Sequence, residues 1–404
     1  MGTEAAAIAV FAMTYLAMAL GRIPGLKLDR AGAALAGAAG MVACGALSLE
    51  EAYRAIDLNT ITLLLGMMIV VAHLRLCGFF AAVGAWAATR AHHPLVLLAA
   101  VVLVSGAFSA FLVNDTVCLV LTPLVCDLTA RLKRDPIPYL LAVAMASNAG
   151  STATITGNPQ NIIIGSLSRI PYTEFAAALA PVAAIALVLT FVLLALLFRH
   201  EFWTRERLAS PPAESPTARP SHLLKPVLVA IAMMAGFFAG LPPAAVAIAA
   251  AAVMLITRRV ESSEVYAQID WPLLAMFAGL FIVVAGIEKW LFSAGAHAVI
   301  GALGLERIPV LSTLTAVLSN VVSNVPAVLV LKPFVAALHE PRRAWLALAM
   351  ASTLAGNLTL VGSIANLIVA RGAEARGIEI RLGTYLKVGL PLTVLSILAG
   401  VLWL

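Results

Sequence analysis

Long apolar runs dominate the sequence, and polar residues gather between them. Residues 5–21, 179–197 and 385–404 are nearly uncharged along their whole length. Each matches the ~20 residues that an α-helix needs to cross a bilayer. The strands of a membrane barrel would instead alternate polar and apolar positions over ~10 residues, and no run has this alternation. The pattern predicts an all-α integral membrane protein.

The second part of the chain repeats the first. Residues 51–57 (EAYRAID) match residues 264–270 (EVYAQID), which lie 213 positions later. Further matches pair Asn114 with Asn324, 210 positions later, and residues 141–163 with residues 346–368, 205 positions later. The shrinking offset indicates short loop deletions in the second copy. Self-similarity at this scale predicts two homologous halves.

Each half is expected to contain the same series of elements: two spans, a short amphipathic connector, a third span, a long interrupted apolar stretch, a broken span and a last span. In the first half the spans and stretches are expected at 5–21, 30–48, after Asp57, 94–130, around 157–159, and 175–198. In the second half they are expected at 223–240, 242–257, 271–287, 308–338, 344–370 and 384–404. The expected organisation is a first repeat (1–199), a linker (200–222) and a second repeat (223–404).

Charge is scarce, and its distribution favours one topology. Only 11% of residues are charged and mean hydropathy is +1.00, against roughly 25% charged residues in soluble domains. This excludes a soluble, disordered or nucleic-acid-binding protein. If the stretches at about 94–130 and 308–338 are re-entrant hairpins, each half crosses the membrane five times and the halves are inverted. In that arrangement 19 of the 26 Lys and Arg residues lie on one side of the membrane. Because basic residues are enriched on the cytoplasmic side, this predicts a bacterial inner-membrane protein with a cytoplasmic linker and with both termini outside the cytoplasm.

Four polar clusters lie within apolar sequence at corresponding positions of the two halves. Two interrupt the predicted hairpins, at 113–116 and 322–326, and two lie in the predicted broken spans, at 147–161 and 352–366. The Gly-Asn-Pro sequence in the first broken span would interrupt a helix and free backbone N–H and carbonyl groups. Such helix ends bind substrates and ions in transporters. The alternative is that these small polar residues only allow close helix packing.

Asp115 is an acid surrounded by apolar sequence. Placing a carboxylate at such a depth costs ~2.5–3.5 kcal/mol, so we expect it to carry a coupling proton or cation. The alternative, compatible with the first, is an N-cap for the second arm of the hairpin. Its counterpart in the repeat is Val325, which would make the coupling chemistry asymmetric. Lys332 would neutralise an anion, pair with an acid or extend to the membrane interface.

These motifs resemble those of a known group of transporters. Residues 111–116 (FLVNDT), followed by residues 121–123 (LTP), resemble the hairpin signature of arsenite-efflux permeases. Residues 157–161 (GNPQN) and 356–366 (GNLTLVGSIAN) resemble the broken-span signatures of the ion transporter superfamily. That superfamily includes divalent-anion/sodium symporters, citrate carriers and sodium/proton antiporters. The resemblance implies an elevator-type secondary transporter, usually a homodimer, whose hairpin tips and broken spans meet at a central site.

The clusters and the resemblance together define two sets of expected site residues. The substrate-binding set is Asn114, Thr116, Asn158, Asn161, Ser323, Asn324, Ser363 and Asn366. The coupling-ion set is Asp115, Asn114, Ser147, Asn148, Thr154, Gly157, Ser352, Asn357, Thr359 and Gly362. No catalytic residue, resident metal or organic cofactor is expected, since neither an HExxH motif nor a GxSxG elbow occurs and the cysteines lack CxxC spacing.

The expected function is secondary active transport of a small anion or oxyacid, with proton-coupled arsenite or antimonite efflux as the favoured instance. In sodium-coupled members of the superfamily, Ser-Asn-Thr motifs at the hairpin tips help to hold ions. Here the tips are Val-Asn-Asp-Thr (113–116) and Ser-Asn-Val (323–325), which favours protons. The alternatives are a sodium/proton antiporter and a sodium-coupled carboxylate or inorganic anion symporter. Expected partners are the substrate, the bilayer, a second copy of the chain and, for an arsenite-type system, a cytoplasmic ATPase subunit.

Overall fold

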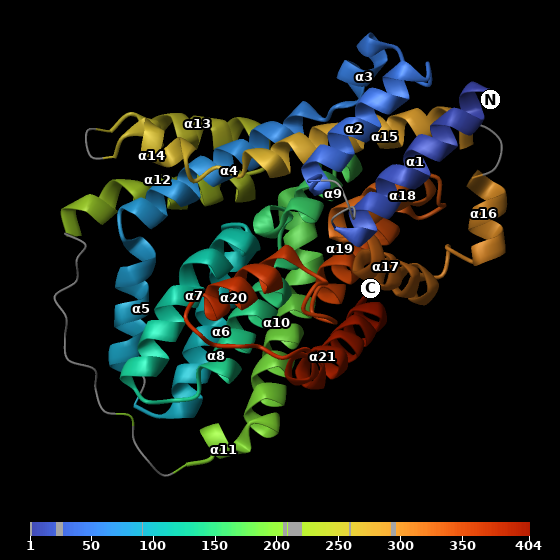
Figure 1. Ribbon diagram of the computed structural model, residues 1–404. Helices are drawn as coiled ribbons and strands as arrows, with labels where there is room; N and C mark the ends of the chain where they lie inside the picture. The colour runs from blue at the N-terminus through green and yellow to red at the C-terminus, as the bar shows by residue number, and fades with distance from the viewer. Residues whose placement is uncertain are drawn as a thin grey trace.

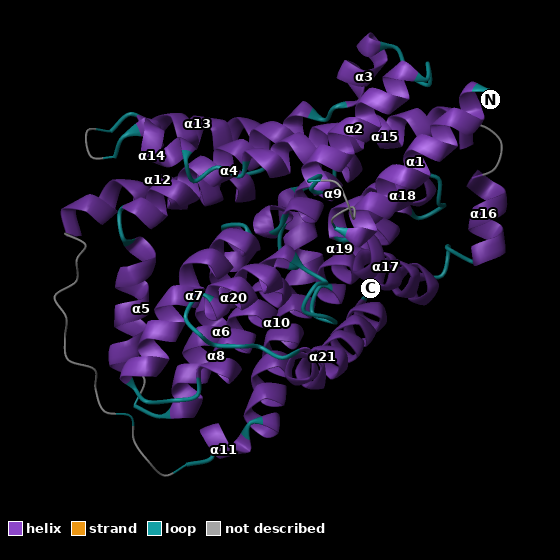
Figure 2. Cartoon of the chain, in the orientation of Figure 1, coloured by secondary structure: helices purple, strands orange, loops and turns teal. Residues whose placement is uncertain are grey.

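The computed structural model describes residues 2–21, 27–90, 92–204, 208, 220–257, 260–291 and 296–404. Within these ranges the chain is helical and contains no β-strand (Figure 2). The prediction of an all-α chain is therefore confirmed for the described residues. Most of the predicted linker, at 205–207 and 209–219, lies outside them.

The first half of the chain forms eleven α-helices and one 3₁₀ turn within the described residues. They are α1 (Thr3–Leu20), α2 (Arg30–Ala43), α3 (Leu49–Ala55), α4 (Leu58–Leu76), α5 (Phe79–Arg90), α6 (Pro94–Phe111), α7 (Asn114–Arg131), α8 (Pro136–Ser151), the 3₁₀ turn η1 (Ile155–Gly157), α9 (Pro159–Ser168), α10 (Tyr172–Leu197) and α11 (Arg199–Phe202). Polar side chains begin several of these helices. Asp29 accepts from the Gly32 N–H at 2.8 Å, and Ser48 and Glu51 form a capping box at α3.

The second half forms helices in the same order. They are α12 (Pro220–Phe238), α13 (Pro243–Leu255), α14 (Ser262–Tyr266), α15 (Trp271–Leu291), α16 (Ala296–Leu303), α17 (Ile308–Val322), α18 (Asn324–Ala336), α19 (Pro341–Ala355), α20 (Ile364–Glu374) and α21 (Leu382–Trp403). The predicted series did not include α5 and its counterpart α16. Both are too short to cross a bilayer, so neither carries the length signal on which the predicted spans depend.

The helices before the hairpins interlock across the two halves. We call α1–α4 and α12–α15 the first helix group, which runs across the upper part of Figure 1. In it α2 packs along α15, and α4 packs along α13. Both contacts are made by a glycine against backbone: a Cβ on Gly66 would lie 2.7 Å from the Ala247 carbonyl carbon, and one on Gly279 would lie 2.7 Å from that of Ala34. The two helix pairs are therefore held at backbone-to-backbone distance.

A second helix group, α6–α10 with α17–α21, lies below the first in Figure 1. Here too the halves contact each other, with α7 on α20, α9 on α18, and α10 on α21. The two helices that precede the breaks, α8 and α19, are buried along nearly their whole length. A helix that is apolar on all sides belongs in an interior. These two helices therefore form the centre of the second group.

Six of the described helices are long and apolar enough to cross a membrane. They are α1, α4, α6, α10, α15 and α21, while α2, α12, α13, α17 and α18 are shorter apolar helices. One of the six, α6, is the first arm of the predicted hairpin at 94–130. Length and composition alone therefore fit several numbers of crossings, and the count of ten spans with two re-entrant hairpins stays a prediction.

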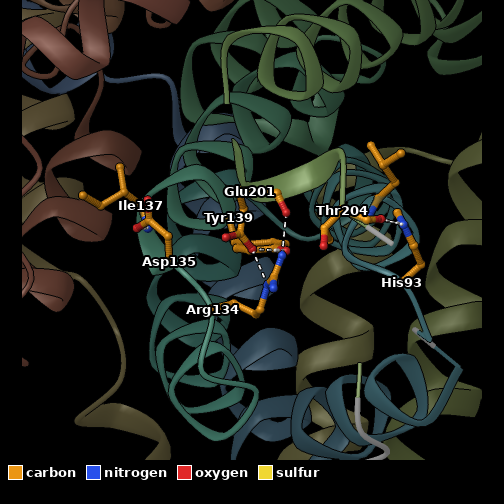
Figure 3. Close-up of polar contacts among 8 residues, drawn as sticks. His93, Arg134, Asp135, Ile137, Tyr139, Glu201 and Thr204 are labelled. Carbon is orange, nitrogen blue, oxygen red and sulfur yellow. Dashed lines mark hydrogen bonds and ion pairs between the residues drawn. The ribbon is translucent and has the colours of Figure 1, made fainter. Parts of the chain in front are cut away.

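The chain that follows α10 is attached to the base of the second group. Arg134 donates from Nε to Glu201 Oε1 at 2.8 Å, and the Tyr139 hydroxyl donates to the same oxygen at 3.0 Å (Figure 3). Glu201 is buried, and a buried carboxylate is stable only when it is paired and hydrogen-bonded. One turn further on, His93 Nε2 lies 3.0 Å from the Thr204 carbonyl oxygen. These contacts hold the start of the predicted linker against α6 and α8.

Candidate functional site at the hairpin tips and helix breaks

Each predicted hairpin turns at a residue with unusual backbone geometry. Between α6 and α7, Val113 has φ of 61°, and between α17 and α18, Ser323 has φ of 79°. The two residues are equivalent, 210 positions apart, and neither is glycine. A positive φ is costly for residues with a side chain, of the order of 1–3 kcal/mol, and such strain is concentrated at functional sites. Directly after each strained residue, Asn114 and Asn324 begin α7 and α18.

Both predicted broken spans are interrupted at equivalent places. The first break separates α8 from α9, and the second separates α19 from α20. Asn158 caps α9 by accepting from the Asn161 N–H at 2.9 Å, and Ser363 caps α20 by accepting from the Ala365 N–H at 3.2 Å. Pro159 is the first residue of α9, a position where the missing N–H costs nothing.

An asparagine closes each break with the same pair of hydrogen bonds. Asn161 Nδ2 donates to the carbonyl oxygens of Ser151, at 3.1 Å, and Thr154, at 3.0 Å. Asn366 Nδ2 donates to those of Gly356, at 2.7 Å, and Thr359, at 3.1 Å. All three positions match at the repeat offset of 205. These bonds satisfy carbonyls that the ends of α8 and α19 would otherwise leave unpaired.

Asn148, on α8, connects the first half to the break of the second. Its Nδ2 donates to Asn357 Oδ1 and to Asn366 Oδ1, both at 3.0 Å. Its Oδ1 accepts from the Ser363 hydroxyl and from Asn114 Nδ2, both at 3.1 Å. Every polar atom of this buried side chain is therefore used. Because Asn114 belongs to a hairpin tip, Asn148 also joins the tip of α7 to the second break.

Thr353, on α19, makes the reciprocal connection. Its hydroxyl accepts from Asn158 Nδ2 at 3.1 Å and from Gln160 Nε2 at 3.2 Å, and it donates to Asn161 Oδ1 at 3.4 Å. All four residues are buried. The first break is thus held by the second half, as the second break is held by the first.

A small cavity of about 30 Å³, partly open to solvent, lies where these elements meet. It is lined by Asn114, Asp115, Pro159, Gln160, Leu273, Met276, Phe277, Ser323, Asn324, Val325, Ser363 and Ile364. Four of the described helices, α7, α9, α18 and α20, begin at this cavity, two from each half. Helix N-termini carry partial positive charge and unpaired N–H groups. Neither α7 nor α18 has a side-chain cap, so their first N–H groups are free to meet a ligand.

Two amide oxygens at the cavity are buried without a partner. Asn114 is 3% exposed and Asn324 is 8% exposed, and no described group donates a hydrogen bond to Oδ1 of either residue. Because Asn114 Nδ2 already donates to Asn148, the position of its oxygen is fixed by the network. Buried polar atoms without a partner are rare in proteins. Both oxygens are therefore available to accept from a ligand hydroxyl or to coordinate a cation.

Asp115 is the acid that lines the cavity. It lies in the first turn of α7 and is partly exposed. The residue before the helix is Val113, so the alternative of an N-capping role for Asp115 is wrong. Among the described residues no group hydrogen-bonds to its carboxylate. Its charge interacts with that of another acid, Asp270, the residue before α15, and the two carboxylates repel each other. No Lys or Arg is among the described lining residues.

The expected site residues fall into layers around the cavity. Asn114, Asp115, Ser323, Asn324 and Ser363 line it. Behind them, the network holds Asn148, Asn158, Asn161, Asn357, Asn366 and Thr359, and the glycines Gly157 and Gly362 lie at the two breaks. Three more donate their hydroxyl to a nearby backbone carbonyl: Ser147 to that of Asn114, Thr154 to that of Ala110, and Ser352 to that of Ala349. Thr116 is partly buried and is not among the lining residues.

Sequence reasoning missed one polar lining residue and the apolar part of the lining. Gln160 follows the break directly, a position that could have identified it. Leu273, Met276 and Phe277 lie on α15, where uniform apolar sequence gave no signal. Lys332 does not line the cavity: its Nζ lies 3.0 Å from Glu288 Oε1. Of the three roles considered for Lys332, pairing with an acid is the one found.

Comparison with known proteins agrees with this architecture. The family model described as "Citrate transporter" (CitMHS) matches residues 13–355. The chain is 34% identical to the "46 kDa membrane protein" of Mycobacterium leprae, over 98% of each chain. It is 29% identical to the "Silicon efflux transporter LSI3" of rice, over 97% of this chain and 95% of that protein.

The fold also matches a solved structure. The YdaH transporter of Alcanivorax borkumensis, whose crystal structure is described as having an unusual topology, superposes with a TM-score of 0.59 over 98% of this chain and 95% of that one, at 15% identity. At this identity the likeness concerns the fold alone. The family match covers most of the chain, including the hairpin tip of α7 and the first break. The chain therefore belongs to the citrate transporter family of the ion transporter superfamily, and it is an integral membrane transporter rather than an enzyme.

Proposed function

We propose that the protein is a proton-coupled secondary transporter that exports a small, hydroxyl-rich oxyacid, of which arsenious or antimonous acid is the favoured instance. One observation carries the proposal. Four helix N-termini, two unpartnered asparagine oxygens and one unpaired carboxylate converge on a single cavity. This combination provides donors and acceptors for hydroxyl groups together with one group that can bind and release a proton.

The chemistry of the lining favours a neutral or weakly charged substrate. A hydroxyl-rich acid donates hydrogen bonds to Asn114 Oδ1 and Asn324 Oδ1 and accepts them from the N–H groups at the starts of α7 and α18. A multiply charged carboxylate would place several negative charges beside Asp115 with no basic side chain among the described lining residues. Such charges are costly to bury unless they are paired. The name of the rice relative, a silicon efflux transporter, supports an oxyacid and export.

The proposed transport cycle uses the repeat. Residues 1–199 and 223–404 form two inverted repeats joined by a cytoplasmic linker, with re-entrant hairpins at about 94–130 and 308–338. The second helix group carries the substrate past the first group in an elevator motion, within a homodimer in the bacterial inner membrane and with both termini outside the cytoplasm. The reciprocal contacts of α2 with α15 and of α4 with α13 support a repeat of this kind. An arsenite-type system would add a cytoplasmic ATPase subunit.

The second candidate function is a sodium/proton antiporter. It is supported by the same two asparagine oxygens, because amide carbonyls and a carboxylate are ligands that a hard cation accepts. In that case the cation is the cargo and Asp115 helps to carry it. A third, a sodium-coupled carboxylate symporter, is supported by the description of the family as citrate transporters.

Flux measurements in proteoliposomes separate these functions. Vesicles that contain the purified protein would be loaded with arsenious, antimonous or silicic acid, or with citrate, and a pH gradient imposed with and without sodium. We expect flux of an oxyacid that depends on the pH gradient and needs no sodium. Proton movement on addition of sodium alone would establish the antiporter, and sodium-dependent citrate flux would establish the symporter. Absence of oxyacid flux under all pH gradients would reject the leading proposal.

A further inference from the structure

One wall of the cavity is apolar and comes from a single helix. Leu273, Met276 and Phe277 line it, at positions i, i+3 and i+4 of α15, which place them on one face of the helix. The polar lining residues Asn114, Asp115, Gln160, Ser323, Asn324 and Ser363 all come from the tips and breaks of the second helix group. A ligand in the cavity therefore finds all of the polar side chains, interspersed with Pro159, Val325 and Ile364, on one side, and meets only hydrocarbon on the other.

The helix that carries this wall, α15, has little freedom to move away from the cavity. One turn beyond the wall, Gly279 packs against the backbone of Ala34 on α2, and two turns further Gly286 packs against Met41, whose Sδ would lie 2.7 Å from an added Cβ. All three wall residues are buried, Phe277 completely. Because protein interiors are close-packed and resist compression, the wall residues must set the depth of the cavity.

We infer that the face of α15 formed by Leu273, Met276 and Phe277 is the size filter of the transporter. The inference rests on the proposed function, which supplies the oxyacid. The hydroxyl groups of the acid point to the tips and breaks, where they find partners, because a hydroxyl against the α15 face would lose its hydrogen bonds to water without replacement. A carbon substituent on the acid then points to the α15 face, and its size decides whether the acid fits.

Met276 is the residue whose size should matter most directly. Met is unbranched and fills irregular space, and truncation to Ala beside a fixed helix opens room that a substituent can occupy. A single methylene changes discrimination in an apolar pocket by roughly 10–200-fold. Met276→Ala should therefore admit a larger substituent, and Met276→Phe should exclude a smaller one.

The test uses three acids with the same trivalent arsenic centre: arsenious, methylarsonous and phenylarsonous acid. Initial rates would be measured in proteoliposomes by total arsenic, with the rate through protein-free vesicles subtracted. We expect Met276→Ala to raise the ratio of phenylarsonous to arsenious acid flux at least about tenfold, and Met276→Phe to lower the ratio of methylarsonous to arsenious acid flux.

Two further variants complete the test. Leu273→Ala replaces Met276→Ala if that variant does not fold. Met254→Ala, at a buried methionine on α13 outside the lining, is the matched control and should leave both ratios as in the wild type.

The outcomes separate this inference from the proposed function. If the wild type carries arsenious acid and the ratios stay unchanged in the Met276 and Leu273 variants, the size filter is rejected while the function stands. If Met254→Ala shifts the ratios as much as Met276→Ala does, general loosening is responsible and the size filter is again rejected. If the wild type carries none of the three acids, the proposed function fails first.

Discussion

Asn148 and Thr353 occupy equivalent positions in the two halves, and each hydrogen-bonds the broken segment of the opposite half. Asn148 on α8 bonds Ser363 and Asn366, whereas Thr353 on α19 bonds Asn158 and Asn161. Since those four partners are themselves equivalent at the same offset, the bonds are related by exchange of the halves. The ends of both breaks are consequently fixed to each other through α8 and α19, the helices that precede the breaks, and the polar side of the cavity behaves as one unit.

Removal of Asn148 should therefore destabilise the whole unit. Asn148→Ala leaves Asn357 Oδ1 and Asn366 Oδ1 without a donor and the Ser363 hydroxyl without an acceptor, and each buried group orphaned in this way costs about 1–3 kcal/mol. We expect a large fall in the thermal midpoint of the detergent-solubilised protein and loss of flux. Thr353→Val should show a smaller fall, because the three hydrogen bonds of Thr353 are shared by one hydroxyl.

The control for Thr353→Val is Thr190→Val on α10. The Thr190 hydroxyl is equally buried but bonds only the Ala186 carbonyl of its own helix. Its loss should change stability little. An equal fall in the thermal midpoint for Thr353→Val and Thr190→Val would mean that the hydrogen bonds between the halves add no more stability than a hydrogen bond within one helix.

The sequence predicted the parts of the site that carry local signals. The Gly-Asn-Pro sequence marked the first break, and the repeat offset transferred it to the second half, where Ser363 takes the place of Asn158 as the cap. Asn114 and Asn324 were identified because polar residues are rare in apolar sequence. In these cases a residue type and its neighbours were sufficient.

The parts that were missed depend on contacts between distant segments. Nothing in α15 distinguishes Met276, which faces the cavity, from Trp271, which is exposed, since both lie in one long apolar run. The partner of Lys332 was also open, because Glu288 lies 44 residues away on another helix. Topology in the membrane stays a prediction, because helix length alone does not distinguish a crossing from a hairpin arm.

The strained backbone at Ser323, in the second hairpin tip, can be tested by comparing two substitutions that both remove the serine hydroxyl. Ser323→Gly and Ser323→Ala both remove the hydroxyl, but only glycine adopts φ of 79° and ψ of 160° without strain. We expect the Gly variant to be more stable than the Ala variant by about 1 kcal/mol, measured by chemical denaturation. Flux should be lower in the Gly variant than in the Ala variant, because the tip loses its fixed geometry. Equal stability of the two variants would contradict strain at this tip.

Asp115 should supply the proton dependence of transport. An amide keeps the size of the carboxylate but does not take up or release a proton, so Asp115→Asn should still allow substrate to move down its own gradient while an imposed pH gradient no longer drives accumulation. The control is Asp127→Asn on the same helix, where the carboxylate is 60% exposed and lies 3.7 Å from Arg376 Nε. That variant should keep the pH-driven flux. Full pH-driven accumulation by Asp115→Asn would show that the proton travels elsewhere.

The ion pair between Glu288 and Lys332 joins the two helix groups, since α15 belongs to the first and α18 to the second. Both side chains are largely buried, 25% and 29% exposed, so Lys332→Met leaves a carboxylate with no counter-charge and should lower the free energy of unfolding by about 1–3 kcal/mol.

Lys289→Met is the matched control, because Lys289 pairs with Glu51 at 2.9 Å on the surface of the first group and both are 46% exposed. Its loss should cost less than about 1 kcal/mol. The double variant Glu288→Gln/Lys332→Met should regain stability relative to Lys332→Met, since the unpaired charge is gone. A double variant less stable than Lys332→Met would mean that Lys332 acts through packing and not through Glu288.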